Sequence, residues 1–284
     1  MYNLIIKNNT IVDIENLEKG EAVDTTSDVF SIDSSFFQDQ KFTSLTIGKN
    51  IAYLKFDETP VTYDFVYVDE ENPIFAVYDN CIYTKNYKKL IKASTNIETL
   101  TLHENTKHIE PYALLGCKKL TKINFNKNLR IIGDYSFKDC TSLKKVHIPK
   151  KVKEIGKASF ENCKNLKKLT QSHKINMIDS GLIAGCNSLR KIIIPEGVMI
   201  MEVGALYNAV SLKHVYLPRS IRLISDCALP IKQKVILHIK KHAKLSFDYI
   251  SSLDLSNICL KGHLHKRVRK FAKNNNMKIM KKGA

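Results

Sequence analysis

The chain has 284 residues, 44% of them hydrophobic, with 45 lysine and arginine residues against 28 aspartate and glutamate residues and a net charge of +17. It contains no run of about 18 apolar residues, so a membrane-spanning helix is not expected. Residues 1–25 lack the basic start and apolar run of a secretory leader, which predicts a cytoplasmic location if the chain is complete.

The charge is unevenly distributed along the chain. Residues 1–96 carry 9 basic and 15 acidic side chains, whereas residues 97–284 carry 36 basic and 13 acidic ones. Such an asymmetry indicates an acidic partner for the second part of the chain. The alternative interpretation is a lysine-rich surface that is only solvated.

Residues 1–28 are expected to form an N-terminal cap. Strand-forming residues at 4–6 and 10–12 flank a short polar turn, which predicts a hairpin that covers the first coil edge. Residues 29–60 form a degenerate first repeat, because their apolar residues have the offsets used by the later repeats. Residues 61–96 are interpreted as an inserted hairpin that projects from the edge of a coil.

A period of 23 residues organises residues 97–230. In each unit a leucine is followed by apolar residues three and five positions later, and often by proline. The second of these apolar positions is occupied by Phe125, Ile148, Gln171, Ile194 and Leu217. The alternation predicts a short strand with one side facing inward. Because a single unit cannot bury its apolar residues alone, the period predicts a leucine-rich-repeat solenoid. We expect a right-handed coil of α/β or mainly β type, with parallel strands and short helical or irregular return segments.

These units resemble the BspA-like leucine-rich repeats, whose unit reads Ile-Gly-x-x-Ala-Phe-x-x-Cys-x-x-Leu-x-x-Ile-x-Ile-Pro-x-x-Val. Residues 155–169 and 143–152 match this pattern closely, and residues 71–91 resemble the hairpin insert of the family. In that insert Asn80 replaces the usual glycine, which a left-handed turn position tolerates. The resemblance covers roughly residues 29–230. It implies surface adhesion or protein binding, and a cell-surface or secreted location if a leader has been removed.

Residues 231–284 lose the period and are expected to form a C-terminal cap with a basic tail. Strands are predicted at 235–239 and 258–260, a short helix at 247–253, and a second helix at 263–274. The lysine and arginine residues between 261 and 282 are interpreted as the solvated side of this cap. The alternative is a contact with nucleic acid or an anionic membrane.

Four of the seven cysteines recur with the repeat: Cys117, Cys140, Cys163 and Cys186. Stacked coils would place them about 4.8 Å apart, with side chains parallel and therefore unsuited to a disulfide. We expect buried, reduced thiols that act as small apolar groups. No closely spaced cysteine pair is present, so neither a metal nor a cofactor is expected.

Alternate side chains of the repeat strands are expected to point outward and to bind the partner. The predicted binding residues are Lys122, Lys145, His147, Lys168, Lys191, His214 and Tyr216. A flanking basic column consists of Lys144, Lys167, Arg190 and Lys213. Like charges stacked about 5 Å apart repel by roughly 1 kcal/mol per pair in water, which solvent and flexible stems tolerate. The columns are therefore either sites for a repeating anion or a solvated face.

Gln171 stands at an inward position, where a buried amide needs hydrogen-bond partners. We expect a bulge or a solvent-exposed turn there. The closely spaced pairs His238 with His242 and His263 with His265 lack a convincing third metal ligand and are expected to be exposed.

Phosphate-binding glycine loops, hydrolase nucleophile motifs and zinc-peptidase motifs are absent from the sequence, so no catalytic residue is assigned. The sequence predicts a non-catalytic, monomeric binding module whose strand face holds a protein. The alternative is an electrostatic binder of a polyanion, either an acidic glycan or a nucleic acid. Single-stranded nucleic acids usually stack on several aromatic residues, and only Tyr216 stands in the outward columns.

Overall fold

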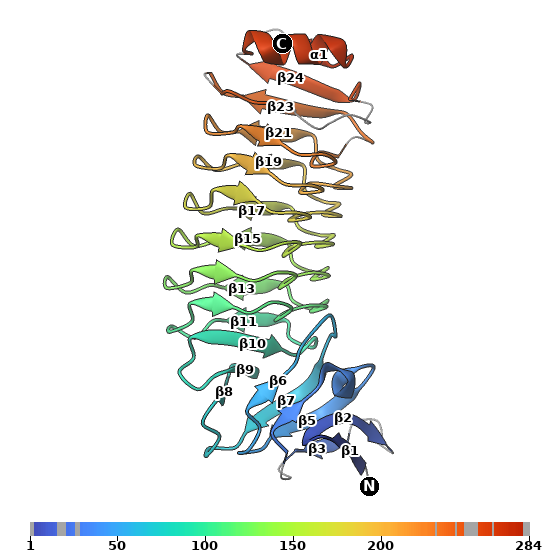
Figure 1. The fold of residues 1–284 in the computed structure, drawn as a ribbon, viewed down its shortest axis with the longest axis vertical. Coiled ribbons are helices and arrows are strands. Elements are labelled where there is room, and N and C mark those ends of the chain that lie inside the picture. The colour runs from blue at the N-terminus through green and yellow to red at the C-terminus, as the bar shows by residue number, and fades with distance from the viewer. Residues whose placement is uncertain are drawn as a thin grey trace.

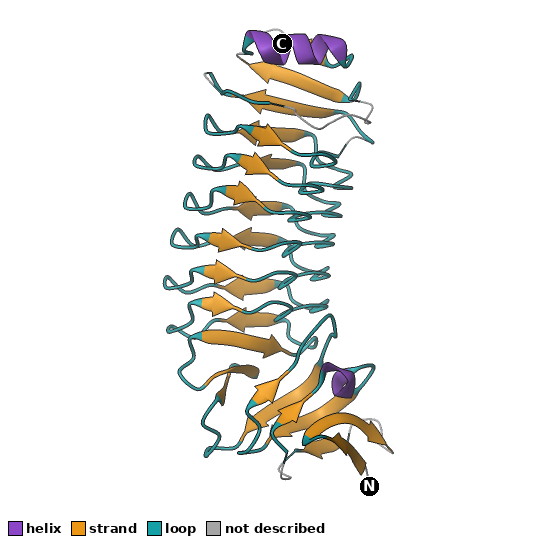
Figure 2. Ribbon diagram, in the orientation of Figure 1, coloured by secondary structure: helices purple, strands orange, loops and turns teal. Residues whose placement is uncertain are grey.

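The computed structural model describes residues 3–15, 21–25, 29–230, 232–241, 243–246, 255–262 and 264–280. They form an elongated stack of coils with the N-terminus at one end and helix α1 (Lys266–Asn274) at the other (Figures 1 and 2). Strands provide nearly all of the regular structure, and the return segments are irregular. The predicted solenoid is therefore confirmed in its mainly β form. No described helix is long and apolar enough to cross a membrane.

The N-terminal coils have strands on two sides. Strands β1 (Asn3–Lys7) and β2 (Thr10–Glu15) form the predicted antiparallel hairpin. Parallel pairs then join β2 to β4 and β6 on one side, and β3 to β5 and β7 on the other. These strands are β3 (Ala22–Asp24), β4 (Ser31–Ile32), β5 (Lys41–Ile47), β6 (Tyr53–Leu54) and β7 (Thr62–Val68). The coil pattern thus extends into segments expected to be a cap and an insert, because β2, β3 and β7 are coil strands.

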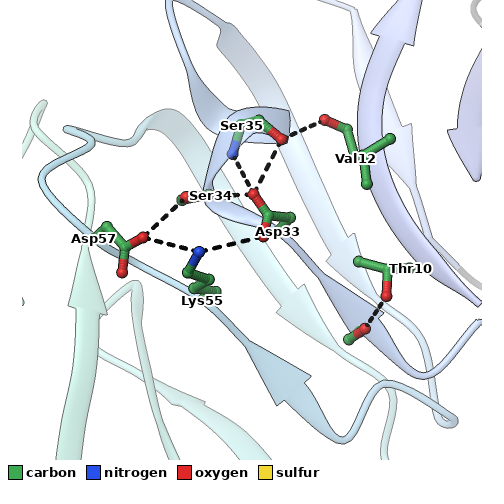
Figure 3. Close-up of polar contacts among 8 residues, drawn as sticks. Thr10, Val12, Asp33, Ser34, Ser35, Lys55 and Asp57 are labelled. Atoms are coloured by element: carbon green, nitrogen blue, oxygen red, sulfur yellow. Dashed lines mark hydrogen bonds and ion pairs between the residues drawn. The ribbon is translucent and has the colours of Figure 1, made fainter. Parts of the chain in front are cut away.

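A polar network joins three successive N-terminal coils (Figure 3). Asp33 caps the short 3-10 helix η1 (Ser34–Phe37) by accepting the backbone N–H of Ser35 at 3.1 Å. This hydrogen bond is the largest cause of the lowered pKa of Asp33. The Ser35 hydroxyl donates to the carbonyl oxygen of Val12 at 2.6 Å, and Lys55 lies 3.6 Å from Asp33 and 3.1 Å from Asp57.

The inserted hairpin is narrower than residues 61–96 and consists of β8 (Phe75–Tyr78) and β9 (Cys81–Thr84). Its turn places Asp79 and Asn80 in the left-handed region, at φ 50° and 53°. Asn80 accepts the N–H of Val66 at 2.9 Å and donates to the carbonyl of Asp64 at 2.7 Å. Asp79 accepts the N–H of Thr101 at 2.9 Å. The turn between β8 and β9 therefore connects strand β7 to Thr101 of the first regular coil.

The regular coils carry strands on two faces, and the face built from the Leu-x-x-Ile-x-Ile segments is called the strand face. Its strands are β11 (Thr99–Thr101), β13 (Lys122–Asn124), β15 (Lys145–His147), β17 (Lys168–Thr170), β19 (Lys191–Ile193), β21 (His214–Leu217), β23 (Val235–Ile239), β24 (Ile258–Gly262) and β25 (Lys278–Met280). The opposite face consists of β10 (Lys89–Ala93), β12 (His108–Ile109), β14 (Ile131–Ile132), β16 (Glu154–Ile155), β18 (Met177–Ile178), β20 (Ile200–Met201) and β22 (Leu223–Ile224).

The return segments stack closely because two positions in most of them are left-handed. The first column is Tyr112, Tyr135, Ala158, Gly181, Gly204 and Cys227, and the second is Gly116, Asp139, Asn162, Gly185 and Asn208.

The cysteine column lies in the core as expected. Cys140, Cys163 and Cys186 donate their thiol hydrogens at 3.2 Å to carbonyl oxygens of the preceding coils.

The C-terminal end of the core is covered by helix α1 and strands β24 and β25. Val268 and Ala272 of α1 are buried, and Leu264 and Phe271 pack against the same core. The predicted second helix is therefore confirmed, with His265 as its N-cap. The helix predicted at 247–253 lies outside the described residues.

Candidate strand-face binding site

The predicted binding residues all lie on the strand face. Lys122, Lys145, His147, Lys168 and Lys191 are exposed, whereas His214 and Tyr216 are half-buried. The flanking residues Lys144, Lys167, Arg190 and Lys213 are exposed as well. None of these eight lysine and arginine residues forms an ion pair with another described residue. The strand face therefore presents cationic groups that no carboxylate of the described chain neutralises.

The columns are not continuous, however. Lys145 pairs with Lys168 in register, and Lys191 pairs with His214. Lys122 pairs instead with Thr99 of the preceding coil. Strands β13 and β15 share no ladder, and neither do β17 and β19. The strand face is thus divided at two junctions, and the predicted column of lysines is interrupted at both.

The two open junctions coincide with two departures from the repeat. At the other junctions the second inward residue of the strand segment is aliphatic and fully buried, and its N–H joins the next coil: Leu102 to Asn124, Ile148 to Thr170 and Ile194 to Tyr216, at 2.8–3.0 Å. At the open junctions this position holds Phe125 or Gln171, and neither backbone N–H has a partner among the described residues. A phenyl ring overfills an aliphatic site, and an amide is poorly suited to one.

The first groove lies at the junction of β13 and β15 and has a volume of about 960 Å³. Its apolar part is formed by Ile123, Phe125 and Val146. Its polar part is formed mainly by basic side chains, namely Lys122, Lys127, Lys144, Lys145, His147 and Lys168. On the opposite face β14 and β16 remain paired, so the coils part on one side only. Three predicted binding lysines and His147 therefore meet around one concavity.

The second groove lies at the junction of β17 and β19 and has a volume of about 410 Å³. Lys168 and Lys191 line it together with Gln171 and Ile193. The expectation of a solvent-exposed turn at Gln171 is wrong, because this residue is only 6% exposed. Both its Nε2 and Oε1 atoms lack a hydrogen-bond partner among the described residues. At this coil the backbone hydrogen bonds between β17 and β19 are missing.

An aromatic patch that the sequence reasoning missed lies beyond the second groove. His238 stacks on Tyr216 with ring centroids 4.1 Å apart, and its Nε2 lies 3.1 Å from Nδ1 of His214. Burial, followed by the positive charges of His214 and Lys261, lowers the pKa of His238. The expectation of an exposed His238 is therefore wrong. Tyr216 and His238 are 22 residues apart, one fewer than the period, so the 23-residue alignment of the sequence does not place them at equivalent positions.

The remaining histidine and metal expectations concern other parts of the chain. His265 caps α1, and His242 and His263 lie outside the described residues. Within the described ranges, no group of three or more histidine, cysteine, aspartate or glutamate side chains could hold a metal ion.

The repeats match a known family of leucine-rich repeats. Residues 107–236 match the BspA type leucine rich repeat region in six copies. The repeat region belongs to this family. BspA-type repeats and the leucine-rich-repeat fold are generally those of non-catalytic binding modules, and leucine-rich-repeat proteins usually bind proteins. No curated protein matches the chain.

Three solved structures share the fold over most of the chain. A leucine-rich repeat protein from Eubacterium ventriosum has a TM-score of 0.67 at 19% identity over 93% of the chain. The pneumococcal vaccine antigen PcpA has a TM-score of 0.56 at 17% identity over 91%. A leucine rich cell surface protein from Faecalibacterium prausnitzii has a TM-score of 0.54 at 17% identity over 91%. The chain spans 66%, 67% and 62% of these proteins, respectively.

Proposed function

We propose that the protein is a non-catalytic binding module whose strand face holds an acidic surface of a partner protein. The observation that carries this proposal is the first groove, where unpaired lysines surround the apolar residues Ile123, Phe125 and Val146. Protein interfaces combine an apolar centre with a polar rim, and this groove offers both. A surface that binds by charge alone needs no apolar centre.

The charge of the groove defines the chemistry of the partner. Among the described residues no aspartate or glutamate lines either groove, and five lysines line the groove at the junction of β13 and β15: Lys122, Lys127, Lys144, Lys145 and Lys168. Opposite charge on a partner accelerates association and selects the partner, whereas the apolar contacts slow its release. Two proteins of the same fold, the pneumococcal vaccine antigen PcpA and a leucine rich cell surface protein, support a binding role.

The test is capture of the partner from the source cells by the immobilised protein, with and without nuclease, followed by salt titration of the purified complex. We expect a protein whose retention is insensitive to nuclease and whose affinity declines gently with salt. A nucleic acid held by about four phosphate contacts would instead give a log–log slope near −3. That slope, or loss of the captured material on nuclease treatment, would contradict the proposal and favour a polyanion.

A further inference from the structure

The second groove contains a polar group that the fold itself leaves unsatisfied. Gln171 is 6% exposed, and neither its amide nitrogen nor its amide oxygen has a partner among the described residues. The matching positions of neighbouring coils hold Ile148 and Ile194, which are fully buried. A buried amide without partners destabilises the fold, so nothing in the packing of the coils explains why glutamine stands here.

The surroundings of Gln171 define what could satisfy it. The groove is lined by Lys167, Lys168 and Lys191, with Ile193 and Pro195 as apolar neighbours. No carboxylate of the described residues lines it. A ligand that fits must offer one hydrogen-bond donor and one acceptor side by side, together with negative charge for the lysines.

An extended peptide has this combination. The N–H and C=O of one residue in a strand point to the same side, and a primary amide can pair with both. Side chains of alternate residues project from an extended peptide, so an acidic residue can reach the lysines while its neighbour lies against Ile193. A chain of phosphodiesters offers negative charge and acceptor oxygens but no hydrogen-bond donor.

The groove can also open without loss of backbone hydrogen bonds. No ladder joins β17 to β19, whereas β18 and β20 on the opposite face remain paired. Parting the walls above Gln171 therefore breaks no hydrogen bond of the strand face.

We propose that the second groove binds an extended acidic peptide segment, one residue of which pairs with the Gln171 carboxamide while a neighbouring carboxylate lies between Lys168 and Lys191. This inference rests on the proposed function and narrows it to a linear segment of the partner.

The test uses a fluorescein-labelled hexapeptide with blocked ends in which glutamate alternates with valine. Its affinity is measured by fluorescence anisotropy for the wild type and for Gln171→Ile, which introduces the residue of the neighbouring coils. A second peptide is N-methylated at a central residue, which removes one N–H donor and keeps the charge. Thr101→Ala on β11 is the control variant, since Thr101 is exposed and lies outside both grooves. Thermal unfolding verifies that Gln171→Ile is folded.

We expect Gln171→Ile to bind the acidic peptide about tenfold more weakly than the wild type. This is the loss in affinity expected when two hydrogen bonds of modest net strength are removed. N-methylation should weaken binding to the wild type and have less than about a twofold effect on Gln171→Ile, because the partner of the N–H is then already lost. Thr101→Ala should behave as the wild type.

Equal binding of the peptide by the wild type and Gln171→Ile would overturn the inference. The proposed function would stand in that case, since the lysines alone would hold the peptide. No binding to the wild type up to about millimolar peptide would also overturn it. Failure of the proposed function has a different signature, namely capture of nucleic acid or glycan in place of a protein.

Discussion

The ammonium group of Lys92 lies 2.9 Å from the carbonyl oxygen of Tyr112, and the residue is fully buried. It also donates to the carbonyl of Thr59 at 2.9 Å and lies 5.4 Å from the ring centroid of Phe56. No described carboxylate pairs with it. Burial therefore lowers the pKa of Lys92 to about 8.

The lowered pKa makes stability depend on pH. An unfolded lysine keeps its proton up to a pKa of about 10.4, so between pH 8 and that value the unfolded state binds more protons. The contribution of Lys92 to the free energy of unfolding then rises by about 1.4 kcal/mol per pH unit. We predict that the difference in unfolding free energy between the wild type and Lys92→Met increases from pH 7.5 to 9.5 in urea titrations.

Comparison with Lys92→Met is needed because the buried thiols act in the opposite direction. Burial raises the pKa of Cys140 and raises that of Cys186 to about 12, so the folded state keeps thiol protons that the unfolded state loses. The thiols therefore lower the free energy of unfolding as the pH rises, and they do so equally in the wild type and in Lys92→Met. A difference that stays constant with pH would show that Lys92 is solvated.

Hydrogen exchange tests the two open junctions. The backbone N–H groups of Phe125 and Gln171 have no partner among the described residues, whereas those of Ile148 and Ile194 donate to the next coil at 2.8 and 2.9 Å. We predict that the first two exchange at least about tenfold faster than the last two, because exchange follows the opening of hydrogen bonds. Phe125→Leu should slow exchange at position 125 if the size of the ring holds the coils apart. Uniform protection at all four positions would mean that the ladder is continuous.

Glycine is required at Gly133 by the close approach of the preceding coil. A Cβ atom at this position would lie 2.6 Å from the backbone nitrogen of Pro111 and 2.9 Å from the carbonyl oxygen of Ile109. We predict that Gly133→Ala lowers the free energy of unfolding by about 1–3 kcal/mol, the usual cost of overpacking. The control is Glu202→Ala at the same position of a later coil, where a side chain is already accommodated. Equal stability of the two variants would show that the coils are not in contact there.

Thiol labelling tests the core column of cysteines. Cys227 is half-buried, and the other six cysteines are 0–2% exposed. We predict that a thiol reagent modifies one cysteine in the native protein at pH 8 and seven after denaturation, because thiolates form poorly when buried. Mass spectrometry identifies the modified residue. Native labelling of Cys140 or Cys163 would contradict the stacking of the coils.

The repeat period predicted most of the fold because each position has one physical role. Leucine, cysteine and aliphatic columns face inward in most coils, so most of the core could be assigned from spacing alone. Lys92 could not be assigned in this way, because a lysine is expected to be solvated and its two carbonyl acceptors come from distant parts of the chain.

The candidate site was predictable only in part. The outward lysines follow from the alternation of the strand, but the grooves depend on whether neighbouring coils pair. Both grooves are marked in the sequence by a non-aliphatic residue in an aliphatic column, Phe125 at the first and Gln171 at the second, but a departure from the repeat was predicted only at Gln171. The stacking of His238 on Tyr216 could not be predicted from the 23-residue period, because the spacing between these two residues is one residue shorter.

The most direct test of the strand face is the affinity of the captured partner for two charge-matched variants. Lys145→Glu with Lys168→Glu reverses two adjacent charges of the first groove, and Lys153→Glu with Lys164→Glu reverses two exposed charges of the same coils outside both grooves. We predict that the first variant loses at least about 100-fold in affinity, as expected for like charges brought together at an interface, and that the second stays within about twofold of the wild type. Equal affinities of the two variants would contradict binding through the strand face.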